Sequence, residues 1–321
     1  MTSRQQPLHS GFGAASTASD VLADLDLRGK TAIVTGGHSG LGLETTRALA
    51  QAGANVVVGA RNPDAAREAT HGMAGVESAA LDLGDLASVA AFAARFVDAR
   101  RDVHIVINSA GIMACPETRV GNGREAQMAV NHLGHYALVN RLWPVLAHGH
   151  GARVVAVSSL GHRLSPIRWD DIQFASGYDK WLAYGQSKTA NALFAVQLDM
   201  LGARFGVRAY SLHPGKIPTP LQRHLTREEM MAQGWVDEHG VPIDPTFKTP
   251  AQGAATQVWA ATSPRLAGIG GVYCEDCDVA AVTRGNEEAG VRPHAIDPED
   301  AERLWRWSAA LTGVDAFAVR R

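Results

Sequence analysis

Tyr184 and Lys188 lie four residues apart in AYGQSK and could together move a proton. On a helix this spacing places both side chains on one face, a turn apart. A phenol is a weak base near neutral pH because its unperturbed pKa is about 10, but a nearby ammonium group lowers that pKa. Tyr184 could then exchange a proton with a substrate oxygen as a general acid or base.

Two alternatives bear on this pair. A tyrosine and a lysine can simply share the exposed surface of a helix. Tyr178 is a second candidate for the phenol, but Leu182 stands four positions after it and carries no charge. The pairing with a cation therefore favours Tyr184.

A glycine-rich turn, TGGHSGLG, runs from Thr35 to Gly42 between the apolar run TAIV and the helical pattern LETTRALAQAG. Glycines remove side chains, so that backbone N–H groups and the helix N-terminus can face a pyrophosphate. A turn that uses glycine for geometry alone is the alternative. The position in the first strand–helix unit favours a dinucleotide site, formed by Gly36, His38, Ser39, Gly40, Leu41 and Gly42.

The elements that must position these residues alternate along the whole chain. Short β-branched runs are separated by helical patterns, the two longest over about Arg124 to Leu146 and Trp181 to Arg204. Buried strands that alternate with helices predict a parallel sheet with right-handed crossovers. The expected strands are TAIVTG, NVVVGA, AALDL, VHIVINSAG, RVVAVSS, VRAYSLHPG and GGVYCED.

We therefore predict an α/β fold, a single doubly wound domain of the Rossmann type with a parallel sheet of about seven strands flanked by helices. It spans residues 29–321 and follows an N-terminal arm, residues 1–28, that is either mobile or a strap. Insertions near 160–181 and 217–249 interrupt the alternation and are expected to build substrate walls.

The second insertion contains a helix start that can be read directly. Thr226 and Glu229 form a capping box, and Leu225 can pack against Met230. Large apolar side chains in the two insertions indicate a fairly apolar pocket, or alternatively core positions. They are Met230, Met231, Trp235 and Trp169.

The bulk composition excludes several classes of partner. Charged residues make up 19% of the 321 residues and the net charge is −2, so neither nucleic acid nor membrane is expected as a partner. There is no apolar run of about eighteen residues, and the N-terminus has no apolar core of a secretory signal. The three cysteines fit a reduced, cytoplasmic protein.

No metal site is predicted. Cys274 and Cys277 form one C-x-x-C without a second pair of ligands, and they are interpreted as small residues at a strand end. His132 and His135 could share a helix face, but no carboxylate or third ligand accompanies them locally.

The glycine spacing, T-G-x-x-x-G-x-G, resembles that of the short-chain dehydrogenase/reductase family. NSAG is similar to the N-N-A-G of this family, with Ser109 in place of the second Asn, and PGKIPT resembles its P-G-x-V-x-T. The resemblance runs in order from about Lys30 to Tyr273. It implies cofactor contacts by Asp82, Leu83, Asn108, Ala110, Gly111, Tyr184, Lys188, Pro214, Gly215, Ile217 and Thr219.

The same resemblance implies a catalytic set of Asn131, Ser159, Tyr184 and Lys188. Ser159 would polarise the carbonyl or alcohol oxygen; the adjacent Ser158 points to the opposite face of the strand, so the choice depends on register. Asn131 would hold a water that links Lys188 to solvent, or it makes a purely structural hydrogen bond. Lys188 would also reach the nicotinamide ribose.

The end of the second strand bears on the cofactor. Enzymes that prefer NAD place an acidic residue there for the ribose 2′-OH, whereas this chain has Ala60 followed by Arg61. Arg61 can pair with a 2′-phosphate, and His38 can assist. NADP(H) is therefore favoured over NAD(H); a solvated surface arginine is the alternative.

Within the family, NSAGIM, NHLGHYAL, VSSLGH and YGQSKTAN resemble the retinol-dehydrogenase-like branch, here as a soluble, bacterial-type oxidoreductase. The resemblance implies hydride transfer between a nicotinamide cofactor and the carbonyl or the primary or secondary alcohol of a fairly apolar, small-molecule substrate. A homodimer or homotetramer is the expected assembly. The alternatives are a carbon–carbon double-bond reductase, a non-catalytic dinucleotide-binding regulator, and an epimerase or dehydratase. Epimerases and dehydratases usually carry a large C-terminal substrate domain, and the residues that follow Tyr273 are few for such a domain.

Overall fold

The central sheet has eight strands in the order β10-β9-β8-β7-β4-β1-β2-β3. The computed structural model describes residues 5–148, 151–285 and 287–318. Every neighbouring pair is parallel except β9 and β10, which are antiparallel. The strands are β1 (Thr31–Thr35), β2 (Asn55–Ala60), β3 (Val76–Ala80), β4 (Ile105–Asn108), β7 (Arg153–Val157), β8 (Arg208–His213), β9 (Val272–Glu275) and β10 (Asp278–Val279).

Six of the seven predicted strands coincide with parallel strands of the sheet, which confirms a single doubly wound α/β domain. The third prediction, AALDL, is displaced, because β3 begins at Val76 and shares only Ala79 and Ala80 with it. The two-residue strand β10 was not predicted. It arises because Asp276 and Cys277 adopt positive φ angles of 50° and 59°, which turn the chain back along β9. Their left-handed conformation closes a tight hairpin that no glycine marks in the sequence.

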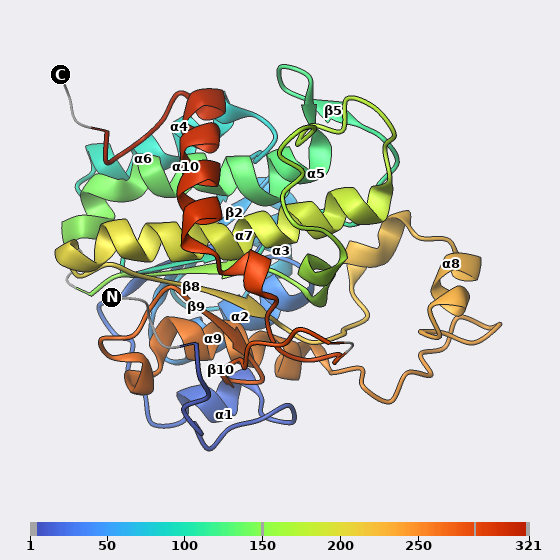
Figure 1. The fold of residues 1–321 in the computed structure, drawn as a ribbon. Coiled ribbons are helices and arrows are strands. Elements are labelled where there is room, and N and C mark those ends of the chain that lie inside the picture. Colours follow the sequence, from blue (N-terminus) through green and yellow to red (C-terminus); the bar gives the residue numbers. More distant parts are fainter. Residues whose placement is uncertain (1–4, 149–150, 286, 319–321) are drawn as a thin grey trace.

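Helices cover both faces of the sheet (Figure 1). Side chains of α1 (Ala18–Leu22), α2 (Gly40–Gln51), α3 (Pro63–Ala69) and α9 (Pro250–Thr262) share one apolar core with one face. Side chains of α4 (Leu86–Asp98), α6 (Gly134–His148), α7 (Lys180–Gly202) and α10 (Pro298–Thr312) share the other. None of the described helices combines the length and apolar character needed to cross a bilayer.

Helix α7 lies between the sheet and α10, which is why it is buried on nearly every side. On its outer face the Phe194 ring stacks on Trp305 of α10, with ring centroids 5.9 Å apart and planes inclined by 6°. Burial on both sides fixes this helix in position. It carries Tyr184 and Lys188.

The helix expected from Arg124 to Leu146 is wrong at its start. Arg124–Glu125 instead form β6, which pairs with β5 (Arg119–Val120). A single turn, α5 (Ala126–Met128), follows and widens into a π-helical turn over Ala129–Leu133 before α6 begins. Such widened turns are frequent at functional sites, and this one contains Asn131.

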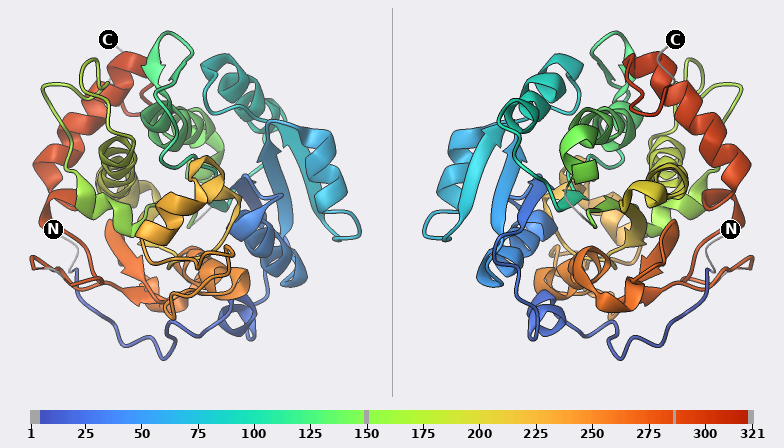
Figure 2. Two further views of the ribbon diagram at one scale, coloured as in Figure 1. Left: turned by 90° about the vertical axis from the view of Figure 1, so that its right-hand side faces the viewer. Right: turned by 90° about the vertical axis from the view of Figure 1, so that its left-hand side faces the viewer.

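Residues 5–28 form a strap beneath the sheet edge (Figure 2). The Gln5 amide donates to the carbonyl oxygen of Tyr273 at 2.8 Å and accepts from its N–H at 2.9 Å. The Asp278 carboxylate accepts the N–H groups of Leu8 and Ser10. The strap is thus tied to β9 and β10.

Residues 217–249, here called the flap, leave the body after β8 and return to α9 (Figures 1 and 2). The N–H of Lys248 donates to the carbonyl oxygen of Lys216 at 2.8 Å and closes the base. The flap contains a 3₁₀ helix, Pro220–His224, and α8 (Arg227–Ala232). The predicted capping box of Thr226 and Glu229 is present at the start of α8.

Candidate active site

A cavity of about 1650 Å³ opens at the carboxyl ends of the parallel strands. This edge of the sheet, where the strand order reverses between β1 and β4, is where open α/β folds bind ligands. The glycine turn, the ends of β2, β4, β7 and β8, the start of α7 and the flap all contribute to its lining. Of the candidate site residues, only Asn108 and Asn131 do not line it.

The glycine turn is shaped to approach an anion closely. Gly36 and Gly40 have φ angles of +67° and +50°, which favour glycine. A Cβ on Gly42 would collide with the Gly36 carbonyl, so the turn packs directly on the first turn of α2. Ser39 makes no side-chain hydrogen bond as the N-cap of α2, which leaves the first N–H groups of the helix without that acceptor. A phosphate fits such a terminus.

The phenol of Tyr184 is buried at the base of the cavity. Burial raises the pKa of Tyr184 to about 12, and a hydrogen bond with the Ser159 hydroxyl opposes this rise. Its ring packs on Gly161, where a Cβ would lie 2.7 Å from the ring carbon Cε1. Asp179 begins α7 by accepting the N–H groups of the two residues that follow Lys180.

Lys188 lies one turn further along α7, with Nζ 5.5 Å from the centroid of the Tyr184 ring. Nζ donates to the carbonyl oxygen of Val157 at 3.0 Å. Burial lowers the pKa of Lys188 to about 8. The pKa of Tyr184 is therefore raised, and not lowered as the spacing predicted, because desolvation of the phenol is the largest cause.

The two serines at the end of β7 lie differently. The Ser158 hydroxyl is buried and donates to the carbonyl oxygen of Lys188 at 2.7 Å. Ser159 is half-buried, accepts the N–H of Gly161 at 3.0 Å and is hydrogen-bonded to Tyr184. Ser159 is thus the serine beside the phenol, whereas Ser158 attaches α7 to the sheet.

Asn131 lies below the cavity, and its side chain holds the loop after β4. Its amide accepts the N–H of Ile112 and donates to the carbonyl oxygen of the same residue, both at 2.9 Å. It also donates to the Ser187 hydroxyl at 2.9 Å, and its own carbonyl oxygen is bonded to His135. These contacts correspond to the structural alternative for Asn131.

The far end of the cavity contains the residues considered for the adenosine half of a dinucleotide. Arg61 is exposed there, beside His38. Burial and the neighbouring Arg61 charge lower the pKa of His38, whose Nδ1 is buried without a hydrogen-bond partner among the described residues. An unpartnered buried nitrogen beside a cation is consistent with a site for a hydrogen-bonding anion. Asp82 and Leu83 line the same end.

Asn108 differs from the other residues considered for cofactor contacts. It is buried at the end of β4, and neither polar atom of its amide has a partner among the described residues. It therefore lies behind the cavity wall.

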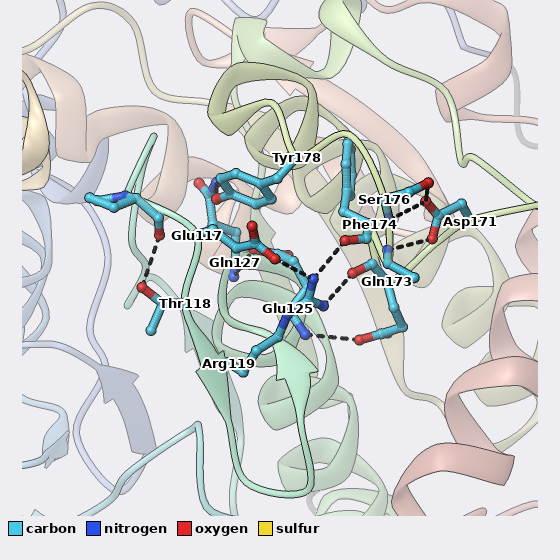
Figure 3. Close-up of polar contacts among 12 residues, drawn as sticks. Glu117, Thr118, Arg119, Glu125, Gln127, Asp171, Gln173, Phe174, Ser176 and Tyr178 are labelled. Carbon is cyan, nitrogen blue, oxygen red and sulfur yellow. Dashed lines mark hydrogen bonds and ion pairs between the residues drawn. The ribbon is translucent and has the colours of Figure 1, made fainter.

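One wall of the cavity is held by a network that the sequence analysis missed (Figure 3). Gln127 accepts the N–H of Ala114 at 2.8 Å and donates to the Tyr178 hydroxyl at 3.0 Å. Tyr178 donates to the carbonyl oxygen of Cys115 at 2.9 Å, so this rival tyrosine supports a lining residue from behind the wall. A glutamine four positions before Asn131 in an otherwise apolar run was the available signal.

The same network joins the first insertion to the β5–β6 hairpin (Figure 3). The Arg119 guanidinium donates to the carbonyl oxygens of Gln173 and Phe174 at 2.5 and 2.6 Å. Glu125 begins α5 by accepting the N–H groups of Gln127 and Met128. Burial raises the pKa of this carboxyl.

The apolar side of the cavity comes mainly from the flap. Leu221, Leu225, Met230 and Trp235 pack with Tyr184 and with the loop after β4. Two of the predicted pocket residues lie elsewhere, because Met231 is exposed and Trp169 packs on α10. The Trp169 indole donates to Asp300 at 3.0 Å and lies under the Arg303 guanidinium.

The histidine pair and the cysteine pair considered as metal ligands are buried in the interior of the protein. His132 is bonded to the Ser308 hydroxyl at 2.7 Å, and His135 to the Thr35 hydroxyl at 2.9 Å. Cys274 and Cys277 are buried free thiols. Within the described ranges no three histidine, cysteine or carboxylate side chains are grouped to hold a metal.

The sequence of this chain is similar to those of known proteins over most of its length. The family described as short chain dehydrogenase matches residues 30–230. A "Probable oxidoreductase" of Streptomyces antibioticus is 46% identical over 91% of this chain and 99% of its own. Retinol dehydrogenase 12 of Bos taurus is 36% identical over 91% of this chain and 89% of its own.

A crystal structure of an uncharacterized protein from Mycobacterium Paratuberculosis superposes with a TM-score of 0.71. It is 33% identical and covers 95% of this chain and 100% of its own. The match of the family over most of the sheet and the site, together with full-length relatives, leads to one conclusion. The chain belongs to the short-chain dehydrogenase/reductase family of oxidoreductases and resembles its retinol-dehydrogenase-like branch.

Proposed function

We propose that this chain is an NADP(H)-preferring oxidoreductase that interconverts a carbonyl group and an alcohol on a bulky, apolar substrate. The observation that carries the proposal is the position of Tyr184. Its buried phenol, hydrogen-bonded to Ser159, lies in the same cavity as a glycine turn suited to a pyrophosphate. A proton donor and a dinucleotide site therefore share one enclosed space.

The residues that would hold the cofactor follow the cavity from end to end. The glycine turn and the N-terminus of α2 would face the pyrophosphate, and Thr219 lies beside Gly40 at the flap. Gly111 would face the nicotinamide half, since a Cβ there would lie 3.7 Å from Lys188 Nζ. A bound nicotinamide would supply the hydride in carbonyl reduction and accept it in alcohol oxidation.

Proton transfer is the task of Tyr184. With a pKa raised to about 12, the phenol keeps its proton at neutral pH and can donate it to the oxygen of a carbonyl that is being reduced. The Ser159 hydroxyl can hydrogen-bond the same oxygen and stabilise its developing charge. Lys188, anchored on Val157, places a positive charge beside the ring and favours the phenolate left by the transfer.

The cofactor preference rests on the end of β2. Ala60 offers no carboxylate for a ribose hydroxyl, and Arg61 and the unpartnered His38 Nδ1 line the same part of the cavity. A charge-assisted, bidentate contact between Arg61 and a 2′-phosphate would favour NADPH over NADH by about ten- to a hundredfold.

The substrate class rests on the apolar flap and on the relatives. Leucine, methionine and tryptophan side chains of the flap face the phenol. Two relatives that are 36% identical are named retinol dehydrogenases, and retinol is the substrate in their names. We expect this chain to act on bulky apolar alcohols, aldehydes or ketones of comparable size.

A substrate panel tests the function, with bulky apolar ketones, aldehydes and alcohols assayed with NADPH and NADH. Carbonyl reduction with NADPH is the expected result. Turnover only of conjugated carbon–carbon double bonds would instead indicate a double-bond reductase. Absence of turnover together with tight dinucleotide binding would indicate a regulator.

Arg61→Ala tests the cofactor preference within one enzyme. It should raise the NADPH KM by about ten- to a hundredfold and leave NADH use nearly unchanged. Ala60→Asp should go further, because a carboxylate repels the phosphate and accepts the ribose hydroxyl. Arg67→Ala, which removes an exposed arginine of α3, is the matched control. Equal loss with both cofactors in Arg61→Ala would refute the phosphate role.

A further inference from the structure

The flap begins directly above the glycine turn. A Cβ on Gly40 would lie 3.5 Å from Thr219 Cβ and 3.9 Å from Pro220 Cδ. The 3₁₀ helix Pro220–His224 therefore starts over the part of the cavity that is suited to a pyrophosphate. Arg223, in this helix, lines the same cavity as Arg61 and His38.

These three groups come from separate segments and lack an acidic partner. Arg223 has one hydrogen bond among the described residues, from its guanidinium to the carbonyl oxygen of Pro220 at 3.1 Å. Among the described residues, no carboxylate lies within ion-pair distance of Arg61 or Arg223. His38 Nδ1 is buried and unpartnered.

The carboxylates that line the cavity are engaged elsewhere. Asp82 accepts the N–H of Gly84 at 2.8 Å, and Asp85 caps α4 by accepting the N–H of Ala87. Glu288 is paired with Lys216 at 3.4 Å. The positive groups around Arg61 are therefore left for a ligand.

The charges of these groups also favour an anion between them. Burial and the charge of Arg61 lower the pKa of Arg223, and the same two causes lower that of His38. An anion placed among the three groups would turn this repulsion into attraction.

We propose that Arg223 is a specificity-determining residue of the flap that contacts the 2′-phosphate of the cofactor from the side opposite to Arg61. The ligand chemistry is an adenosine that carries a 2′-phosphate. This inference rests on the proposed NADP(H) preference and adds a residue from a different segment.

The contact would also close the substrate wall. Two residues after Arg223, Leu225 is buried against Tyr184 and Met113. Leu221, two residues before it, packs in the same cluster. A phosphate that holds Arg223 would therefore hold the apolar side chains that face the phenol, and an adenosine without it would not.

Binding of two matched ligands to the full chain tests the contact without turnover. Adenosine 2′,5′-bisphosphate and 5′-AMP differ only by the 2′-phosphate, and calorimetry gives both affinities. Arg223→Ala should lower the ratio of the two affinities about tenfold, and Arg223→Lys should lower it less, because the charge remains while the planar fork is lost. Arg227→Ala is the matched control, since this exposed flap arginine does not line the cavity and its guanidinium donates to the carbonyl oxygen of Glu238.

Hydrogen–deuterium exchange gives a second readout, on the flap itself. In the unmodified chain the bisphosphate should slow exchange across residues 217–235, and 5′-AMP should do so far less. In Arg223→Ala this difference should vanish, whereas both ligands should still protect the glycine turn. Arg227→Ala should behave as the unmodified chain.

The outcomes separate this inference from the function on which it rests. If the unmodified chain binds both ligands equally, the NADP(H) preference itself is refuted. If it prefers the bisphosphate and Arg223→Ala keeps that preference, only the role of Arg223 is overturned. Equal weakening of both ligands by Arg223→Ala would assign the arginine to the 5′-phosphate and also overturn the proposal.

Discussion

The floor and the flap of the cavity are built in opposite ways. On the floor, Tyr184, Lys188 and Asn131 are buried, and their polar groups are bonded to backbone or to neighbouring hydroxyls. In the flap only Ile217, Leu225 and Val236 are buried, and α8 has no buried residue. One region is determined by many contacts, the other by few.

This difference separates two tasks. Proton transfer requires groups held within a few tenths of an ångström, which a packed interior supplies. Recognition of the substrate and of a phosphate allows a segment of low local stability that opens and closes. We therefore expect changes on the floor to alter the rate or global stability, and changes in the flap to alter affinity.

Removal of the Tyr184 hydroxyl should have the largest effect. Tyr184→Phe should lower kcat by about two to four decades, the usual scale for a general acid or base, while cofactor affinity and the melting temperature stay close to those of the unmodified chain. Steady-state kinetics, cofactor titration and thermal unfolding measure these quantities. Tyr178→Phe is the matched control: it removes a hydroxyl that is bonded to Cys115 behind the cavity wall, and its effect on kcat should be below about tenfold. Near-normal turnover of Tyr184→Phe would place the proton donor elsewhere.

Because Tyr184 on the floor exchanges the proton, alcohol oxidation and carbonyl reduction should depend on pH in different ways. Alcohol oxidation needs the Tyr184 phenolate, so with a pKa near 12 its rate should rise about tenfold per pH unit from pH 6 to 8, below the pKa of Lys188. Carbonyl reduction uses the protonated phenol and should stay flat, then decline above pH 8, where Lys188 loses its charge. Initial rates in both directions at constant ionic strength test this. A reduction rate that rises with pH would contradict it.

A change in the flap should act on affinity. Trp235→Ala removes an indole that lines the cavity next to Trp181, so the KM of an apolar substrate should rise about tenfold at nearly constant kcat. Met231→Ala, an exposed change in the same flap, should leave KM unaltered. A fall in kcat without a change in KM would mean that the flap positions the reacting groups.

Acid should destabilise the floor more than the flap. Burial lowers the pKa of His213 to about 3 and that of His135 to about 4, so both stay neutral in the folded chain at pH 5. Their unfolded forms bind a proton below about pH 6.5, and stability present above that pH is lost as the pH falls toward 4. Each contributes a slope of at most about 1.4 kcal/mol per pH unit. Denaturant unfolding at pH 7 and 5 measures the loss; equal stability at both would contradict it.

The amino-acid sequence alone determined those features of the structure that depend on residues close together along the chain. The glycine turn, the Tyr184–Lys188 spacing and the Thr226–Glu229 capping box are local patterns, and the alternation of strands and helices follows from periodicity. Each could be recognised because the physical constraint acts within a few residues. The parallel sheet followed from the same patterns.

Only the tertiary structure decided which groups meet. The choice of Ser159 over Ser158 depends on how β7 faces α7, and the network of Gln127 and Tyr178 joins segments 51 residues apart. Arg223 lines the same cavity as Arg61, near enough for their charges to interact, because the flap passes over the glycine turn, which no local pattern indicates. The pKa of Tyr184 rose where spacing alone predicted a fall, because desolvation depends on everything packed around a group and not on its neighbours in sequence.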